Sequence, residues 1–307
     1  MRAFTLDSFD SPPRLRDDLP EPHPGDDELL VRVQASSVNP ADAAIAAGML
    51  KDMAEHDFPV TLGRDFAGTV EQTGSSVTRY QPGEEVYGFL LHADPTVHDG
   101  SWTELITVPE DNFVATKPAN LDHAHAGAAP LAGITALAAL DALAPAQGET
   151  VLVIGATGGV GSFFVQLAAE TGADLIAPAL PEDDEYLRDL GVTEVLDRNA
   201  DLETTVRQHH PEGVDAILDL ANFTSQEALL REDGRLASPL GAAGEATNRF
   251  NLMAQPTPDN LKRLADCIDS GTLGVHIHET YGLAHAGEAL QHLTSQHTQG
   301  KIGLTVE

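Results

Sequence analysis

A glycine-rich turn between two apolar segments is the part of the sequence whose residue types and spacing indicate a specific chemistry. The apolar run 151–154 leads directly into Gly155-Ala156-Thr157-Gly158-Gly159-Val160-Gly161, and an apolar helix is expected over residues 162–170. Glycines at such a turn let a diphosphate approach backbone N–H groups and the positive end of the helix dipole. The pattern therefore predicts a dinucleotide site, with cofactor contacts at Gly155, Ala156, Thr157, Gly158, Gly159 and Val160.

The alternative for this motif is an ordinary strand-to-helix turn that needs glycine for its backbone angles. The context favours the dinucleotide site, because the strand, the helix, a C-cap at Gly172 and a second strand from Asp174 complete a βαβ unit. Gly161 is expected to allow close packing of helix on strand. The sequence therefore predicts a dinucleotide-binding βαβ unit.

The segments that position this turn change in character along the chain. Before residue 118, short strands are separated by turn residues, with Pro-Gly pairs ahead of two of them; the strands are expected at 28–33, 66–71, 85–89 and 102–108. From about Pro118, apolar runs alternate with helical patterns, which predicts a parallel, doubly wound sheet; the runs are 151–154, 175–177, 216–220 and 236–238. The last part is expected to form helices over 259–270 and 284–294, with strands near Val275 and Ile302.

Composition limits the function classes. At 307 residues the chain is long enough for two domains, each with its own core. The 48 acidic residues against 17 basic ones give a net charge of −31, which opposes binding to nucleic acids and anionic membranes. The excess acid is spread along the chain, and we interpret it as a solvated acidic surface suited to a high-salt cytoplasm.

The single cysteine, Cys267, is compatible with a reducing compartment and excludes a thiolate metal cluster. Residues 1–7 contain no apolar core of signal-peptide length, so a cytoplasmic protein is expected. Three histidine pairs invite a metal interpretation, which we reject because each lacks a third ligand at a recognisable spacing; they are His123/His125, His209/His210 and His276/His278.

Five motifs in order resemble the medium-chain dehydrogenase/reductase superfamily, in its zinc-free quinone oxidoreductase branch, which includes zeta-crystallin-like proteins. They are 36–42 (SSVNPAD), 63–71 (GRDFAGTVE), 131–137 (LAGITAL), the glycine turn and 300–302 (GKI). The resemblance implies an α/β protein: a GroES-like β-rich catalytic domain of residues 1–117 and 256–307, and a Rossmann domain of residues 118–255. It also implies a homodimer, and a cleft that holds nicotinamide and substrate.

Zinc-dependent members of this superfamily carry Cys and His at the positions of Asn39 and Arg64, and many have a four-cysteine lobe that this sequence lacks. The resemblance therefore implies catalysis without a metal. Without a Lewis acid, a developing oxyanion depends on hydrogen-bond donors or water. This favours an activated acceptor, either a quinone or an α,β-unsaturated carbonyl compound that accepts hydride at its β-carbon.

The resemblance assigns roles to several side chains, each with a structural alternative. Asn39 is expected to be catalytic and to bind the nicotinamide ribose or the substrate oxygen; alternatively it fixes a turn before Pro40. Thr135 is expected on the nicotinamide side, or packs in its helix. Arg64 and Asp65 are expected to pair with each other. Tyr87 is a candidate catalytic phenol, and with Phe89 and Trp102 it forms either an apolar quinone slot or part of the core.

Cofactor choice depends on the loop after the second strand of the doubly wound sheet, where NADPH-binding relatives often carry a lysine. Here the lysine position is occupied by Asp184, whose carboxylate would repel a 2′-phosphate. Arg198 offers a compensating guanidinium, or is an exposed surface arginine. Family habit and Arg198 together favour NADP(H) over NAD(H). We expect further cofactor contacts at Ala179, Ala221, Leu240, Gly241 and Lys301.

The expected mechanism is direct hydride transfer to a quinone or enone, after which a proton reaches the oxyanion or enolate. No His, Tyr or Lys in the sequence is an evident proton donor, so water is the expected source. The competing hypothesis is a nucleotide-binding sensor or structural protein of the same fold with little turnover, because the binding motif would look the same.

Overall fold

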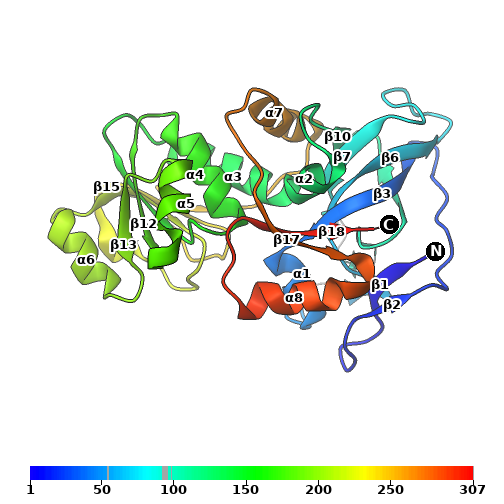
Figure 1. Ribbon diagram of the computed structural model, residues 1–307, viewed down its shortest axis with the longest axis horizontal. Helices are drawn as coiled ribbons and strands as arrows, with labels where there is room; N and C mark the ends of the chain where they lie inside the picture. The colour runs from blue at the N-terminus through cyan, green and yellow to red at the C-terminus, as the bar shows by residue number, and fades with distance from the viewer. Residues whose placement is uncertain (54, 92–95, 98, 307) are drawn as a thin grey trace. The chain divides into compact units, whose positions relative to one another are not determined.

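Residues 1–53, 55–91, 96–97 and 99–306 are described by the computed structural model, and they form two units (Figure 1). Unit 1 consists of Met1–Leu131, Pro256–Asp269 and Val275–Glu307, and unit 2 of Ala132–Gln255 with Ser270–Gly274. The first division falls at Leu131, later in the chain than the expected boundary after residue 117. The reason is that helix α2 (His123–Ala128) packs on strands of unit 1.

Unit 1 is built on a seven-stranded sheet. Its order is β10-β7-β6-β3-β18-β17, with β9 also paired to β3. The strands are β3 (Glu28–Val38), β6 (Asp65–Thr73), β7 (Glu85–Phe89), β9 (Leu105–Pro109), β10 (Val114–Thr116), β17 (Ile277–Gly282) and β18 (Lys301–Thr305). The C-terminal strands thus complete a sheet that the N-terminal strands begin, because β18 pairs antiparallel with β3. The expected β-rich GroES-like fold is confirmed.

Smaller elements complete unit 1. Two short sheets have the orders β2-β1-β5 and β4-β8. Their strands are β1 (Ala3–Leu6), β2 (Arg14–Arg16), β5 (Val60–Thr61), β4 (Glu55–His56) and β8 (Thr96–Val97). The other helical elements are α1 (Pro40–Ala46), α7 (Pro258–Asp269), η3 (Leu283–His285) and α8 (Ala286–Ser295).

Strand β3 is longer and more buried than its alternating pattern predicts. It continues to Val38, and Arg32 is its one exposed residue. The physical reason is its central position, since it pairs with β6, β9 and β18. Helix α2 covers it so closely that a Cβ on Gly127 would lie 2.8 Å from the Ala35 backbone. This packing buries Ser36 and Ser37, which the candidate site uses.

Unit 2 confirms the expected parallel sheet. Its six strands have the order β13-β12-β11-β14-β15-β16, and every pairing is parallel. The strands are β11 (Thr150–Ile154), β12 (Asp174–Ala179), β13 (Glu194–Asp197), β14 (Val214–Asp219), β15 (Leu230–Ser238) and β16 (Arg249–Asn251). The apolar runs of the sequence predict neither β13 nor β16, which are the two short edge strands of this sheet.

The helices of unit 2 differ from the expected regular alternation. They are α3 (Pro130–Leu143, which begins in unit 1), α4 (Gly159–Ala169), η1 (Pro181–Asp183), α5 (Asp184–Leu190), α6 (Leu202–His209) and η2 (Glu227–Leu229). Only the short η2 lies between β14 and β15. Helix α4 begins at Gly159, three residues before the expected start, so the glycines form its first turn.

The order of the strands creates a switch point in this sheet. From β11 the chain moves outward through β12 and β13, then returns to β14 on the other side of β11 and moves outward again. The reversal lies between the carboxyl ends of β11 and β14. In open parallel sheets of this type, ligands bind at such a switch point.

Each unit has its own apolar core. The core of unit 1 includes Leu29, Phe66 and Trp102, and that of unit 2 includes Leu152, Ile176 and Ile217. Among the described residues, no helix has both the length and the apolar character needed to span a bilayer.

Candidate active site

The glycine turn in unit 2 contains glycines that the fold requires and one that it does not. Gly155 has a φ of +88°, and a Cβ on Gly161 would lie 2.2 Å from the Gly155 carbonyl oxygen. Both positions therefore need glycine for the fold itself. Gly158 has φ −75° and ψ 177°, which any residue adopts, and its Cβ would meet nothing closer than 3.7 Å. Gly158 leaves open space, as a bound diphosphate needs.

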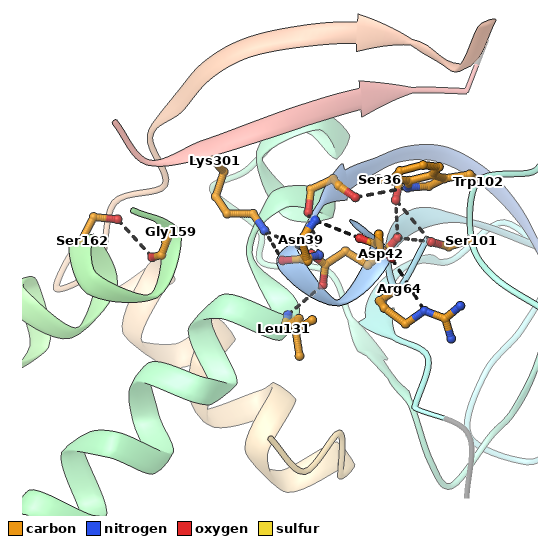
Figure 2. A network of polar contacts seen from close by, with 12 residues as sticks. Ser36, Asn39, Asp42, Arg64, Ser101, Trp102, Leu131, Gly159, Ser162 and Lys301 are labelled. Atoms are coloured by element: carbon orange, nitrogen blue, oxygen red, sulfur yellow. Dashed lines mark hydrogen bonds and ion pairs between the residues drawn. The ribbon is translucent and has the colours of Figure 1, made fainter. Parts of the chain in front are cut away.

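The first turn of α4 offers unpaired donors beside this space. Gly158 is the N-cap and has no side chain to cap the helix, and the first helical hydrogen bond runs from Ser162 N to Gly158 O at 2.8 Å. The N–H groups of Gly159, Val160 and Gly161 precede that bond, so they have no partner within the helix. The Ser162 hydroxyl is turned back to the Gly159 carbonyl at 3.1 Å (Figure 2). Backbone amides and a helix dipole of this kind favour an anion, and the diphosphate contact expected here stays a prediction.

The other expected cofactor residues of unit 2 lie at the same edge of the sheet. Each follows or ends a parallel strand at its carboxyl end: Ala179 ends β12, Arg198 follows β13, Ala221 follows β14, and Leu240 and Gly241 follow β15. These residues, which lie 24 to 86 positions after Gly155 in the sequence, are therefore aligned along one edge with the glycine turn, because parallel strands bring their carboxyl ends together.

Arg198 lies beside the end of β12. Its backbone N–H donates to the Ala179 carbonyl at 3.1 Å, so the side chain starts next to the residue where Rossmann proteins recognise the adenosine ribose. The side chain is exposed and forms no ion pair with any residue that the structure describes.

The carboxylates after β12 are expected to repel a 2′-phosphate, but in the structure two of them are engaged by other groups. Asp183 is fully buried, and its Oδ2 accepts a hydrogen bond from Leu180 N at 3.2 Å. Asp184 forms an i,i+4 ion pair with Arg188 at 2.8 Å. One carboxylate thus caps a turn and the other is paired with a cation, which weakens the repulsion that the sequence predicts.

In unit 1, Asn39 lies between β3 and α1, and its side chain belongs to a polar network. Asn39 is extended, with φ −125° and ψ 156°, as the residue before a proline requires. Its Oδ1 accepts from Lys301 Nζ at 2.6 Å, and its Nδ2 donates to Asp65 Oδ2 at 2.8 Å. Figure 2 shows the Lys301 ammonium and the Asn39 amide facing each other. Asn39 is also the N-cap residue of α1, so both interpretations stay open, and its contact with the nicotinamide ribose stays a prediction.

Asp65 is the centre of this network. Its Oδ2 accepts from Asn39, from Ser37 Oγ at 2.5 Å and, at 3.5 Å, from Lys301, while its Oδ1 accepts from Leu131 N at 2.7 Å. The hydroxyls of Ser36 and Ser101 donate to its backbone carbonyl. The carboxylate is fully buried. A buried carboxylate with this set of donors is held in one orientation.

Arg64 has a different partner from the one expected. The structure places its Nε 3.7 Å from Asp42 Oδ1, and the carboxylate of Asp65 faces Lys301 and Asn39 instead. Asp42 also accepts from Asn39 N at 2.8 Å. Burial raises the pKa of Asp42 to about 6, against the opposing effect of Arg64, and burial lowers the pKa of Arg64.

The three aromatic candidates lie in the core of unit 1. Tyr87 is fully buried, its hydroxyl donates to Leu261 O at 2.5 Å, and burial raises the pKa of its phenol above the usual value. A phenol in this environment is a structural donor, so the geometry contradicts the catalytic role expected of it. Phe89 and Trp102 are also buried, and the Trp102 indole donates to Ser37 O. The core interpretation holds for all three.

Thr135 lies on α3 and is 7% exposed. Its burial fits helix packing, and the nicotinamide contact expected of it stays a prediction. Among the described residues, no group of three or more His, Cys, Asp and Glu side chains is arranged to hold a metal ion. The His209/His210 pair instead contacts Glu194.

The sequence identified Asn39 and Lys301 separately but missed that Asp65 joins them. The two residues are separated by 262 positions, and only the pairing of β18 with β3 brings them together. The sequence did contain a signal for this link. A buried lysine requires a carboxylate partner, and Asp65 lies in one of the five motifs on which the family resemblance rests.

Two family models match parts of this chain. Residues 25–119 match the alcohol dehydrogenase GroES-like domain, and residues 190–304 match the zinc-binding dehydrogenase family. A 2-methylene-furan-3-one reductase of Solanum lycopersicum is 30% identical over 278 residues, which cover 88% of this chain and 70% of the relative. A chloroplast envelope quinone oxidoreductase homolog of Arabidopsis thaliana is 28% identical over 305 residues, covering 92% and 91%.

A solved structure, the quinone oxidoreductase of Coxiella burnetii, superimposes with a TM-score of 0.89 at 28% identity, covering 100% of this chain and 99% of that one. The similarity therefore extends over both units.

Proposed function

The chain belongs to the medium-chain dehydrogenase/reductase superfamily, in its quinone oxidoreductase branch, and from this premise we propose that it is an NAD(P)H-dependent reductase of quinones and α,β-unsaturated carbonyl compounds. The observation that carries the proposal is Gly158. The fold does not need glycine there, yet the position leaves an open cradle at the N-terminus of α4, at the switch point of the parallel sheet.

The cofactor would be held by the glycine turn and by the residues at the carboxyl edge of the sheet, namely Ala179, Arg198, Ala221, Leu240 and Gly241. When bound, NAD(P)H supplies a hydride. In unit 1, Asn39 and Lys301 are the polar groups that we assign to nicotinamide ribose and substrate. Tyr87 is left out of this assignment because its hydroxyl is bonded to Leu261.

Asn39 and Lys301 have complementary capacities that fit these roles. An amide oxygen has two lone pairs, and Lys301 uses one of them, so Asn39 Oδ1 can accept from a ribose hydroxyl. An ammonium has three N–H donors, and Asn39 and Asp65 account for two. The third can stabilise an oxyanion or enolate oxygen in a site of low dielectric. Water then supplies the proton to carbon or oxygen.

We propose that the reaction proceeds without zinc. Asn39, at the position of a zinc ligand in zinc-dependent members, already uses its amide toward Lys301 and Asp65. Arg64, at the position of the second ligand, brings a positive charge that repels a metal cation. The donor set of the site is therefore suited to an oxygen-bearing organic ligand.

NADP(H) is the preferred cofactor in this proposal. Rossmann proteins that select NAD usually place an acidic residue on the ribose at the end of the second strand, and this chain has Ala179 there. Arg198 adjoins that position with an exposed guanidinium, a group that binds a 2′-phosphate through two parallel hydrogen bonds.

Two further proposals concern the state of the protein. We propose a homodimer, supported by the free edge of β16 and by Met253, which follows that strand and is 70% exposed. We also propose a cytoplasmic location, supported by a single cysteine. Light scattering of the purified protein tests the first, and fractionation of the source cells tests the second.

The proposed activity is tested by following NADPH and NADH oxidation at 340 nm with a simple ortho-quinone and with a short 2-alkenal. Turnover of either acceptor, faster with NADPH, is the expected result. Tight binding of NADPH without turnover of any quinone or enone would contradict the proposal and favour a nucleotide sensor of the same fold.

A further inference from the structure

The Asp65 carboxylate receives hydrogen bonds from four separate segments of the chain. It contacts Ser37 at the end of β3, Asn39 before α1, Lys301 at the start of β18 and Leu131 at the start of α3. Two of these partners, Asn39 and Lys301, are the polar groups assigned above to cofactor and substrate.

We infer that Asp65 is a positioning residue for hydride transfer, which fixes the orientation of the Asn39 amide and the place of the Lys301 ammonium. This inference rests on the proposed function. In the proposed function, Asp65 touches neither cofactor nor substrate, and it acts through Asn39 and Lys301.

The orientation of the Asn39 amide follows from the chemistry of the partners. A lysine ammonium can only donate hydrogen bonds, and an ionised carboxylate can only accept them. Lys301 Nζ lies 2.6 Å from Asn39 Oδ1, and Asp65 Oδ2 lies 2.8 Å from Asn39 Nδ2. If the amide were flipped, its NH₂ group would face the lysine donor and its oxygen would face the carboxylate acceptor, and both hydrogen bonds would be lost. Asn39 is therefore presented to a ligand as an acceptor, which suits a ribose hydroxyl and excludes an oxyanion.

The charge of Lys301 depends on Asp65 as well. Both side chains are nearly inaccessible, with exposures of 4% for Lys301 and 0% for Asp65, and their charged atoms lie 3.5 Å apart. A buried ammonium without a counter-charge is strongly disfavoured, so the carboxylate keeps this donor in place. The consequence is a division of roles, in which Asn39 accepts from the cofactor and Lys301 donates to the substrate oxygen.

Asp65 also connects these residues to the helix that continues into unit 2. Its Oδ1 accepts from Leu131 N at 2.7 Å in the first turn of α3, where a carboxylate is favoured by the helix dipole. Helix α3 passes from unit 1 into unit 2 after Leu131 and carries Thr135 one turn further along. The same carboxylate thus holds the start of that helix and the two site side chains.

The test compares Asp65→Asn with a matched control, Asp215→Asn. Asp215 is also a mostly buried carboxylate that accepts a backbone N–H, from Thr150 at 2.8 Å, and pairs with a cation, Arg231 at 2.5 Å. It lies at the amino-terminal edge of the unit 2 sheet, away from the expected cofactor residues. Losing it therefore removes the same kinds of contact without touching Asn39 or Lys301.

The kinetic arm measures kcat and KM with NADPH and an ortho-quinone. Asp65→Asn is expected to lower kcat about 100-fold with little change in KM for the quinone, because misplaced groups affect the transition state more than ground-state binding. Asp215→Asn is expected to keep kcat within about threefold of wild type. An equal loss of kcat in both variants would overturn the inference.

A second arm needs neither cofactor nor turnover. The chain has four lysines, so the ammonium ¹H–¹⁵N correlation spectrum of the nucleotide-free protein is simple. Lys301 is expected to give a slowly exchanging signal that is lost in Asp65→Asn and retained in Asp215→Asn, while the signal of buried Lys117 stays in both. If the Lys301 signal is retained in Asp65→Asn, the positioning role is contradicted. This result does not depend on turnover, so it can be told apart from a failure of the proposed function, which would show as a wild-type protein without activity.

The double variant Asp65→Asn/Lys301→Met covers the case in which Asp65→Asn does not fold, because it leaves no unpaired buried charge. It is expected to fold and to have a lower kcat than the single variant Lys301→Met, in which Asp65 still accepts from Asn39 Nδ2. Equal kcat values in the double variant and in Lys301→Met would overturn the inference.

Discussion

Lys301 Nζ lies 2.6 Å from Asn39 Oδ1. The last strand of the chain thus supplies the donor that orients the amide of Asn39, a residue in the N-terminal part of the sequence. This contact exists because β18 pairs with β3, with Ile302 opposite Val38. Strand pairing places the residues that precede Ile302 and follow Val38 next to each other. The polar centre of unit 1 is therefore assembled from both ends of the sequence.

Replacing Lys301 by Met removes the partner of Asn39 and leaves Asp65 without its buried cation. We expect kcat with NADPH and a quinone to fall about 100-fold, since both orientation and oxyanion stabilisation are lost. Lys117→Met is the matched control, because Lys117 is also buried but donates to the carbonyls of Pro118 and Leu121. If the two variants lose kcat equally, Lys301 has only a structural role.

Gly158 and Gly161 are expected to respond differently to larger residues. Gly158→Val has open space and an ordinary backbone conformation, so the protein should fold normally, yet the side chain would obstruct the diphosphate and weaken NADPH binding at least tenfold. Gly161→Ala meets the Gly155 carbonyl and should destabilise the fold by about 2 kcal/mol or more. Thermal unfolding and a fluorescence titration with NADPH measure both effects. Unchanged NADPH affinity in a folded Gly158→Val protein would refute the proposed cofactor site.

Removing the Arg198 guanidinium is expected to change cofactor preference. Arg198→Ala should weaken NADPH binding about 10- to 100-fold through the loss of hydrogen bonds to a phosphate, and should leave NADH binding unchanged. The control is Arg188→Ala, because the guanidinium of Arg188 is already paired with Asp184. The ratio of the dissociation constants for NADPH and NADH measures the effect, and an unaltered ratio in Arg198→Ala argues against a 2′-phosphate contact.

Asp42 is expected to make stability depend on pH in a direction opposite to that of most paired carboxylates. Its pKa is about 6 in the folded state against 3.8 for an ordinary aspartate, so between these values the folded protein binds more protons than the unfolded chain. Stability relative to Asp42→Asn should therefore decrease as the pH rises from about 4 to about 6, by about 3 kcal/mol. Denaturant unfolding of both proteins at several pH values tests this. A difference that grows over that window would show that Arg64 outweighs burial.

The net charge of −31 is expected to make stability depend on salt. Self-repulsion among dispersed carboxylates disfavours the compact state, and it weakens as the Debye length falls from about 10 Å at 0.1 M to about 3 Å at 1 M salt. The melting temperature should rise with potassium chloride over this range. A melting temperature that does not rise would count against adaptation to a high-salt cytoplasm.

The sequence alone determined the parallel sheet and the glycine turn, because these depend on local order: an apolar strand, glycines and an apolar helix in succession. It also determined that a separate β-rich unit precedes them. The cofactor edge could be anticipated for the same reason, since residues that end successive parallel strands lie together whenever such a sheet forms.

Only the tertiary structure decided which side chains the polar centre of unit 1 contains. The sequence suggested that Arg64 pairs with its neighbour Asp65 and made Tyr87 a candidate catalytic phenol, whereas the structure places Arg64 beside Asp42 and buries the Tyr87 hydroxyl against Leu261. The link from Lys301 to Asn39 crosses nearly the whole chain. Sequence spacing determines the period of a strand or helix, but strand pairing and burial determine which distant polar groups meet, and that assignment requires the folded chain.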